Sequence, residues 1–402
     1  MAARALGARH CAGGLVSAAS EIVAVANTAE LRDALLDAAA RAVPLRITAG
    51  EHWLDAGRPV CADHRLSVAA LDGITEYTPG DLTLTARAGT SLAEIARVTA
   101  TERQWLALDP FGPSTGSIGA TIATGSAGPL AHAFGTPRDN VLGLEAVTGT
   151  GAVVRAGGRV VKNVAGFDLT RLFTGSWGTL GVITEVTVRL RALPEVDESY
   201  VMPVDDGVEL VSALATRLSA AAVAPLALEL VNGALASRLA LGRAPCLLVR
   251  LGGNAESVRA QRAALEEVAP IAPSPAAVWS ALRECEPARA AVIRLSMRPS
   301  RIAEAWSFAR VATAAIEGAL VHASIGRGVV RCIVPCDDAA ELDPFLASVR
   351  TFAGTRIVER LPANRWPAPA TSTAPRERLS RGIQDRFDPM HLLNPGIMGE
   401  HP

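Results

Sequence analysis

The sequence predicts an α+β protein of two domains, and two patterns along its 402 residues support this class. The first part of the chain begins with a predicted strand at residues 22–25. A helix capped by Thr28 follows it, and a second strand is predicted at residues 45–48. This order is typical of a domain in which strands and helices alternate. From about residue 200 to residue 353, two further strand–helix–strand units follow. These units predict an antiparallel sheet that helices cover on one side.

The first domain is expected to comprise residues 21–195, after a loose tail at residues 1–20. Alternating apolar residues and runs rich in Val and Thr predict strands at residues 82–88, 142–148, 152–155 and 180–190. Short helices are predicted at residues 92–100 and 169–173.

The composition changes near Pro194, and residues 196–361 are expected to form the second domain. Predicted strands lie at residues 226–231, 246–251, 291–297 and 329–335, and predicted helices at residues 255–268, 300–315 and 339–353. Residues 362–375 are rich in Pro, Ala and Thr and are interpreted as a linker. Residues 376–402 form a C-terminal segment that begins with a predicted helix.

Charge and composition exclude several classes of function. The formal net charge is −1 and aromatic residues make up 4%, so neither a basic nucleic-acid surface nor a base-stacking platform is expected. No unbroken apolar run of about 18 residues occurs, so no transmembrane helix is expected and the protein is predicted to be cytoplasmic. Only Cys332 and Cys336 of the six cysteines are close together, and their spacing is a poor match to a metal site. Free thiols and no bound metal are therefore expected.

A glycine-rich stretch at residues 111–128 is the first candidate for a binding site. It places glycine, serine and threonine between short apolar pairs. Exposed amides in such a loop bind anions, and glycine lets the backbone approach a pyrophosphate closely. A set of tight turns between core strands is the structural alternative.

Three enzymatic motifs fit less well. Residues 112–116 have the spacing of a serine nucleophile elbow, but two prolines interrupt the strand that such an elbow requires. Lys162 is followed by Asn163 and therefore does not complete a Walker A loop. The residues after Gly151 lack the third glycine of a dinucleotide fingerprint, so a hairpin is preferred there.

Residues 162–184 carry a longer motif, KNVAGFDLTRLFTGSWGTLGVIT. This run resembles the K-N-x-x-G-[YF]-D and G-S-x-G-T-L-G motifs of FAD-linked oxidases of the PCMH type, in the vanillyl-alcohol-oxidase superfamily. Residues 77–90 (YTPGDLTLTARAGT) and 387–396 (FDPMHLLNPG) resemble two further motifs of that family, in the same order. The resemblance implies two α/β subdomains that hold FAD and an antiparallel cap domain, with the C-terminal segment returning to the FAD domain.

The resemblance also implies which residues contact the FAD. They are Gly50, His52, Pro113, Ser114, Thr115, Gly116, Ser117, Ile118, Gly119, Thr124, Gly125, Gly128, Lys162, Asn163, Gly178, Gly181, Val182 and Ile183. The family's first pyrophosphate loop has the form R-G-G-G-x-S, whereas residues 48–53 here read TAGEHW and keep one glycine. The Glu51 carboxylate would repel a pyrophosphate unless it points away. His52 lies where some family members attach the flavin covalently; an exposed or packing histidine is the alternative.

Within this superfamily the chain resembles the FAD-binding E subunits of bacterial glycolate oxidases. Their partners are a D-lactate-dehydrogenase-like flavoprotein subunit and an iron–sulfur subunit. Residues 321–331 keep His322 but lack the Asp, Asn and second His of the dehydrogenase motif, and Trp177 replaces a Glu. The resemblance therefore implies an FAD-binding subunit of a glycolate or D-lactate dehydrogenase complex, which its partners could hold at the inner membrane.

A 2-hydroxy acid requires a cation for its carboxylate, preferably a bidentate Arg, and a base such as His. The second domain offers His322 and Arg294 as catalytic candidates, with Arg327 and Arg331 as further cations. An exposed ion pair is the alternative role for each Arg. Two other functions stay open: a self-sufficient FAD dehydrogenase of an unknown substrate, and a structural subunit that has lost its flavin.

Overall fold

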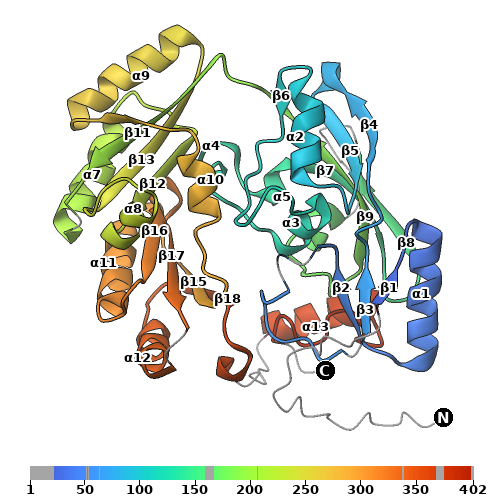
Figure 1. The fold of residues 1–402 in the computed structure, drawn as a ribbon. Coiled ribbons are helices and arrows are strands. Elements are labelled where there is room, and N and C mark those ends of the chain that lie inside the picture. The colour runs from blue at the N-terminus through green and yellow to red at the C-terminus, as the bar shows by residue number, and fades with distance from the viewer. Residues whose placement is uncertain are drawn as a thin grey trace.

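The computed structural model describes residues 22–50, 52, 54–62, 64–158, 167–205, 207–336, 339–367 and 375–399. The predicted tail, Glu51, Lys162 and Asn163 lie outside these residues. Figure 1 shows two bodies, with three sheets from the first part of the chain on the right and one large sheet with its helices on the left. The predicted α+β fold class is confirmed.

A small parallel sheet begins the first domain. Its strands lie in the order β1 (Ile22–Ala24), β3 (His64–Ser67) and β2 (Leu45–Thr48). Helix α1 (Thr28–Arg41) packs its buried leucines against this sheet. The predicted cap of this helix is wrong by one residue, because Asn27 accepts the Glu30 amide with its Oδ1 at 2.9 Å and leaves Thr28 inside the helix.

A five-stranded antiparallel sheet forms the centre of the first domain. Its order is β4 (Ile74–Thr78), β5 (Thr83–Arg87), β9 (Val182–Arg189), β7 (Val141–Val147) and β8 (Val153–Gly157). A two-stranded ribbon pairs β6 (Gln104–Trp105) with β10 (Arg191–Ala192). The helices of this region are η1 (Pro79–Asp81), α2 (Leu92–Ala100), α3 (Ile118–Thr124), α4 (Ala131–Phe134), α5 (Pro137–Asn140) and α6 (Leu169–Phe173).

Helix α3 lies very close to the end of β5. A Cβ atom on Gly119 would come 2.6 Å from the Cβ of Ala88, so this approach requires glycine. Ser117 caps the helix by accepting the Ala120 amide at 3.2 Å, and Gly125 ends it with φ of 67°. Several residues of the predicted glycine-rich site therefore shape this helix.

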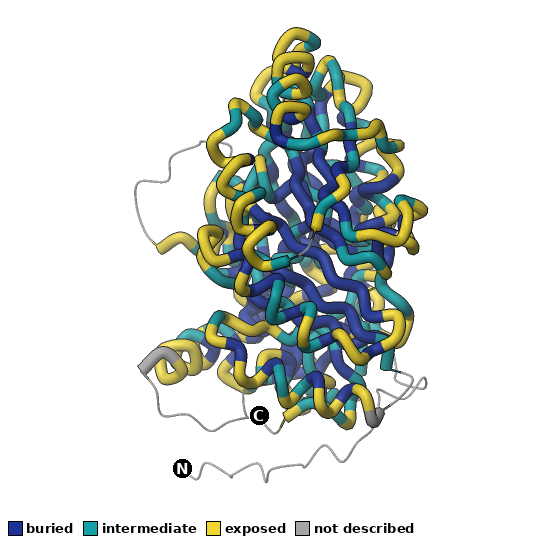
Figure 2. The backbone as a smooth tube through the Cα atoms, turned by 90° about the vertical axis from the view of Figure 1, so that its left-hand side faces the viewer, coloured by how far each residue is buried: buried dark blue, intermediate teal, exposed yellow. Residues whose placement is uncertain are grey.

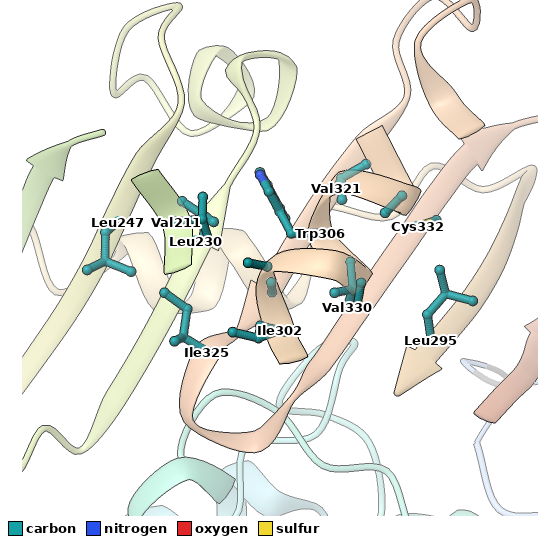
Figure 3. Close-up of a cluster of buried hydrophobic side chains, with 14 of the residues drawn as sticks. Val211, Leu230, Leu247, Leu295, Ile302, Trp306, Val321, Ile325, Val330 and Cys332 are labelled. Carbon is teal, nitrogen blue, oxygen red and sulfur yellow. The ribbon is translucent and has the colours of Figure 1, made fainter. Parts of the chain in front are cut away.

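The second domain is one antiparallel sheet of eight strands. Their order is β14 (Ala272–Ser274), β11 (Val196–Pro203), β13 (Cys246–Gly253), β12 (Ala227–Val231), β16 (Leu320–Ser324), β17 (Val329–Pro335), β15 (Ala290–Ser296) and β18 (Thr355–Arg360). Helices α7 (Val208–Ala220), α9 (Ala255–Val268), α11 (Ile302–Thr313) and α12 (Ala339–Arg350) lie along its outer face in Figure 1. The largest core lies between this face and those helices, around the fully buried Trp306 (Figure 3).

The second face of this sheet is not bare, which corrects the prediction of helices on one side only. Helices α8 (Gly233–Arg238) and α10 (Val278–Arg283) bury a second apolar cluster on part of it. The rest of that face carries polar side chains, including Glu229, His322 and Arg331, and faces the first domain. Figure 2 shows buried residues running through the middle of the molecule beneath exposed outer segments.

The C-terminal segment packs on the first domain. Helix α13 (Pro375–Phe387) is followed by residues that lie beside β2, where the Leu45 amide donates to the Leu392 carbonyl at 2.8 Å. Three single turns complete the fold: η2 (Pro299–Arg301), η3 (Ile325–Arg327) and η4 (Ala363–Arg365). Among the residues described, no helix has the length and apolar character to span a membrane.

Candidate functional site

A pocket of about 690 Å³, partly open to solvent, lies among β2, α3, the turn before β9 and the C-terminal segment. Seven of the residues predicted to bind the cofactor line it. They are Gly50, Gly119, Thr124, Gly178, Gly181, Val182 and Ile183. Segments that are far apart in the sequence are thus brought to one cavity.

The pocket has further lining residues that sequence reasoning missed. These include Arg46, Ile47, Leu54, Val68, Ala88, Ala123, Trp177, Asn394 and Ile397. Trp177 and Asn394 lie inside the quoted motifs, so the motifs carried a signal for them. Nothing in the sequence marked Arg46, since it is one of many arginines.

Asn394 joins three walls of this pocket. Its Nδ2 donates to the Trp177 carbonyl at 2.8 Å, and its Oδ1 accepts the Ile47 amide at 2.8 Å. Trp177 has φ of 55°, a left-handed conformation that is rare outside glycine. A Cβ atom on Gly178 would come 2.9 Å from Asn394 Nδ2, so glycine is needed beside this amide. The C-terminal motif therefore positions the turn that precedes β9.

Several other predicted cofactor residues do not line the pocket. Pro113, Ser114, Thr115 and Gly116 form a turn against the start of α2, where the Ala93 and Leu92 amides donate to the carbonyls of Ser114 and Gly116. His52 is exposed, and its Nε2 lies 3.1 Å from Thr115 Oγ1.

Ser117 and Gly125 cap α3, and the Ile118 side chain is buried in the core of the first domain. Gly128 lies so close to the Asp109 carbonyl that a Cβ atom would be 1.9 Å away. Gly128 therefore serves close backbone packing. Lys162 and Asn163 are outside the described residues.

Arg46 is the only charged residue among the described residues that line the pocket. Its side chain is 7% exposed, its Nη2 donates to the Leu54 carbonyl at 3.4 Å, and its Nη1 has no hydrogen-bond partner. Burial and the neighbouring Arg65 lower the pKa of Arg46 to about 10. A flavin dinucleotide combines apolar rings with a diphosphate, so the apolar lining and this unpaired cation fit FAD.

The predicted base, His322, lies on β16 in the second domain. Its Nδ1 is 2.8 Å from Glu229 Oε2 on β12, and both side chains are buried. Its Nε2 has no partner, and neither has the buried Ser324 Oγ two residues further on. The Phe111 ring of the first domain lies 5.4 Å from the imidazole. A carboxylate that holds one ring nitrogen fixes the orientation of the other.

The predicted cation Arg294 lies in the same row across the sheet, since His322 pairs with Arg331 and Arg331 with Arg294. Arg331 contacts Glu359 at 2.6 Å and Glu286 at 2.8 Å, and its guanidinium stacks 3.6 Å from the Phe111 ring centroid. Burial opposes its charge, but the two carboxylates raise the pKa of Arg331 overall. Arg294 Nε is 3.4 Å from Glu359. Carboxylates of the chain itself therefore neutralise both cations.

Two titratable residues at the interface between the two domains are not among the residues predicted from the sequence. Burial raises the pKa of Asp109 to about 7, even though the Leu130 amide donates to its carboxylate at 3.0 Å. Burial lowers the pKa of His132, whose Nδ1 has no partner. Arg327, another predicted cation, donates to the Gly128 carbonyl at 3.4 Å. The interface thus holds ionisable groups from both domains.

Within the described part of the chain, no cluster of three or more His, Cys, Asp or Glu could hold a metal ion. Cys246, Cys285 and Cys332 are free thiols, and the Cys336 thiol donates to the Val334 carbonyl at 3.6 Å. Cys61 takes part in a disulfide bond, so the expectation of free thiols is wrong for that residue.

Comparison with known proteins agrees with this geometry. Residues 19–157 match the family described as an FAD binding domain. The chain is 40% identical over 153 residues to glycolate oxidase subunit GlcE of Escherichia coli, a match that covers 38% of this chain and 43% of that protein. It is 33% identical over 162 residues to glycolate oxidase subunit GlcD of Bacillus subtilis, covering 40% and 34% of the two chains. The chain thus spans less than half the length of these relatives in each match.

The structural similarity to solved proteins covers more of the chain than the sequence matches do. A solved structure of p-cresol methylhydroxylase superposes with a TM-score of 0.71 at 14% identity, covering 94% of this chain and 88% of that one. Both domains of the present chain therefore share an established fold. The first domain therefore carries an FAD binding domain, and FAD is its cofactor.

Proposed function

We propose that the chain is the FAD-binding subunit of a dehydrogenase complex that oxidises a 2-hydroxy acid, glycolate or D-lactate, to the 2-oxo acid. The similarity to two glycolate oxidase subunits supports the substrate class. Bound FAD supplies the two-electron redox chemistry. In this proposal the electrons pass from the flavin to an iron–sulfur partner, while a D-lactate-dehydrogenase-like partner carries the substrate site.

The neutralised cations of the second domain are the observation that carries the subunit role. A substrate carboxylate requires an Arg whose donors are free. Arg331 is held by Glu286 and Glu359, and the Arg294 Nε lies 3.4 Å from Glu359. Displacing either carboxylate would leave a buried charge without its partner, which is costly. The chain is therefore better suited to bind flavin than to bind a substrate anion at Arg331 and Arg294.

His322 supports the second candidate, a self-sufficient FAD dehydrogenase. Glu229 holds its Nδ1 at 2.8 Å, and its Nε2 is left without a partner. An imidazole so oriented could take a proton from a substrate hydroxyl at Nε2. In that case Arg294 would have to exchange Glu359 for the substrate carboxylate. The third candidate, a structural subunit without flavin, would leave the pocket unused.

A flavin titration followed by reduction assays separates the three. The purified chain is titrated with FAD and its visible spectrum recorded, then glycolate or D-lactate is added under anaerobic conditions with and without the two partner subunits. The proposal expects bound FAD that bleaches only when the partners are present. Bleaching by the isolated chain would favour the self-sufficient enzyme, and a chain that binds no FAD would favour the structural role.

A further inference from the structure

The wall of the pocket formed by β2 carries a buried charge that no described carboxylate neutralises. Arg46 is 7% exposed, and among the described residues its guanidinium makes one long hydrogen bond, to the Leu54 carbonyl at 3.4 Å. No described carboxylate forms an ion pair with it. An uncompensated buried charge is costly. A buried polar group without a partner requires an explanation, and a bound anion is one.

A second arginine makes this arrangement less favourable still. Arg65 on β3 is the register partner of Arg46, and neighbours in a parallel pair point to the same face. The Nε of Arg65 is also buried without a hydrogen-bond partner. Repulsion from Arg65, together with burial, keeps the pKa of Arg46 below its usual range. Two adjacent cations with no anion among the described residues favour the binding of an anionic ligand beside them.

The adjacent loop explains why a cation would be needed here. Residues 48–53 keep a single glycine, Gly50, where the family's loop has several. Side chains on the other positions limit how closely backbone amides can approach a phosphate. Fewer amide donors leave more of the diphosphate charge to be met by other groups. A guanidinium presents several donors in one plane and can meet two phosphate oxygens at once.

We propose that Arg46, with Arg65 behind it, binds the diphosphate of FAD and replaces the anion-binding function of the altered glycine loop. This role rests on the proposed function, because it requires that the chain retains FAD. It makes Arg46 a cofactor-affinity residue that the family motifs do not mark. It also accounts for two arginines without an ion-pair partner among the described residues, whereas the buried Arg331 contacts two carboxylates.

The test compares Arg46→Gln with the wild-type chain in two measurements. FAD affinity is obtained from the quenching of FAD fluorescence, and the Tm is recorded with and without FAD. Arg46→Gln should weaken FAD binding about 10- to 100-fold, the range expected for a lost hydrogen bond to a charged group. Its Tm without FAD should be unchanged or higher, since one of two repelling charges is removed. The FAD-induced rise in Tm should shrink.

Two further variants make the result specific. Arg97→Gln removes the same charge from an exposed ion pair with Glu94 on α2 and should bind FAD within about twofold of wild type. Arg46→Lys keeps the charge without the planar donors and should lose less affinity than Arg46→Gln.

The outcomes distinguish this role from the proposed function. A wild-type chain that binds no FAD contradicts the proposed function itself. If the wild type binds FAD, three results overturn the role of Arg46: an affinity of Arg46→Gln within twofold of wild type, equal losses in Arg46→Gln and Arg46→Lys, or a lower Tm of Arg46→Gln without FAD. The last result would mark Arg46 as a structural residue.

Discussion

The side-chain amide of Asn394 donates to the Trp177 carbonyl at 2.8 Å, across a separation of 217 residues. The same side chain accepts the Ile47 amide at 2.8 Å. One residue of the C-terminal segment therefore links β2 to the turn before β9 through two hydrogen bonds. Both segments line the candidate flavin pocket, so the shape of that pocket depends on the C-terminal segment.

Replacing Asn394 by Ala should destabilise the chain and weaken FAD binding together. The change leaves the Ile47 amide and the Trp177 carbonyl without partners, and each such group costs about 1–3 kcal/mol when buried. We expect the free energy of unfolding to fall by about 2–4 kcal/mol in urea denaturation. Asn254→Ala removes the exposed cap of α9 and serves as the control; a loss of that helix cap costs about 1 kcal/mol and should leave FAD affinity unchanged. If the Asn394→Ala chain had wild-type stability, the two hydrogen bonds of Asn394 would not stabilise the fold.

Gly119→Ala should lower stability by about 1–3 kcal/mol, because the added methyl group would overpack α3 against Ala88. The helix must then move away from β5, which also widens the pocket that Gly119 lines. Gly382→Ala in α13 is the matched control, since a Cβ there meets no atom within 4 Å. That variant should be about 0.4–1 kcal/mol more stable. Equal effects of the two substitutions in thermal unfolding would argue against close packing of α3.

Asp109 should make stability fall as pH rises toward neutrality. Its folded-state pKa, about 7, lies above the ordinary value of 3.8 for an Asp carboxyl, so the folded chain binds the proton more tightly than the unfolded chain. The contribution is complete below about pH 4 and is lost as pH rises through about 7. Asp109→Asn has no such titration. The free energy of unfolding is measured by urea denaturation at pH 5 and pH 8. The wild type should lose stability relative to Asp109→Asn at the higher pH. If the difference in stability between the two chains were the same at both pH values, the raised pKa of Asp109 would be refuted.

Arg331→Met should be strongly destabilising, by about 3–5 kcal/mol, because Glu286 and Glu359 would lose their buried partner. The exposed pair Arg301–Glu304 provides the comparison. Arg301→Met removes the same type of side chain at the surface and should change stability by about 1 kcal/mol or less. The measurement is the denaturant midpoint of each variant. Similar small losses of stability in both would show that the ion pairs of Arg331 contribute little.

Local patterns were sufficient for many elements and for part of the site. Residues 255–268 and 329–335 were predicted with the bounds that the structure has, because their periodicity is strong. The motifs around Gly119 and Gly178 led directly to the pocket. The strand β16 was missed, since LVHAS is short and its burial depends on strands on both sides.

Contacts between distant segments were beyond the reach of sequence patterns. The role of Asn394 depends on its contacts with Trp177 and Ile47, and the paired state of Arg331 depends on Glu286 and Glu359. The unusual state of Asp109 follows from burial at the domain interface. None of these partners is fixed by spacing along the chain.

The sequence by itself determined the α+β class and the FAD binding domain, because glycine turns, apolar periodicity and ordered motifs are local properties of the chain. Only the tertiary structure decided which cations are paired. Arg331 and Arg46 are both buried arginines on strands, yet one meets two carboxylates and the other meets none among the described residues. That difference is electrostatic, and it depends on which side chains folding brings within a few ångströms of each guanidinium.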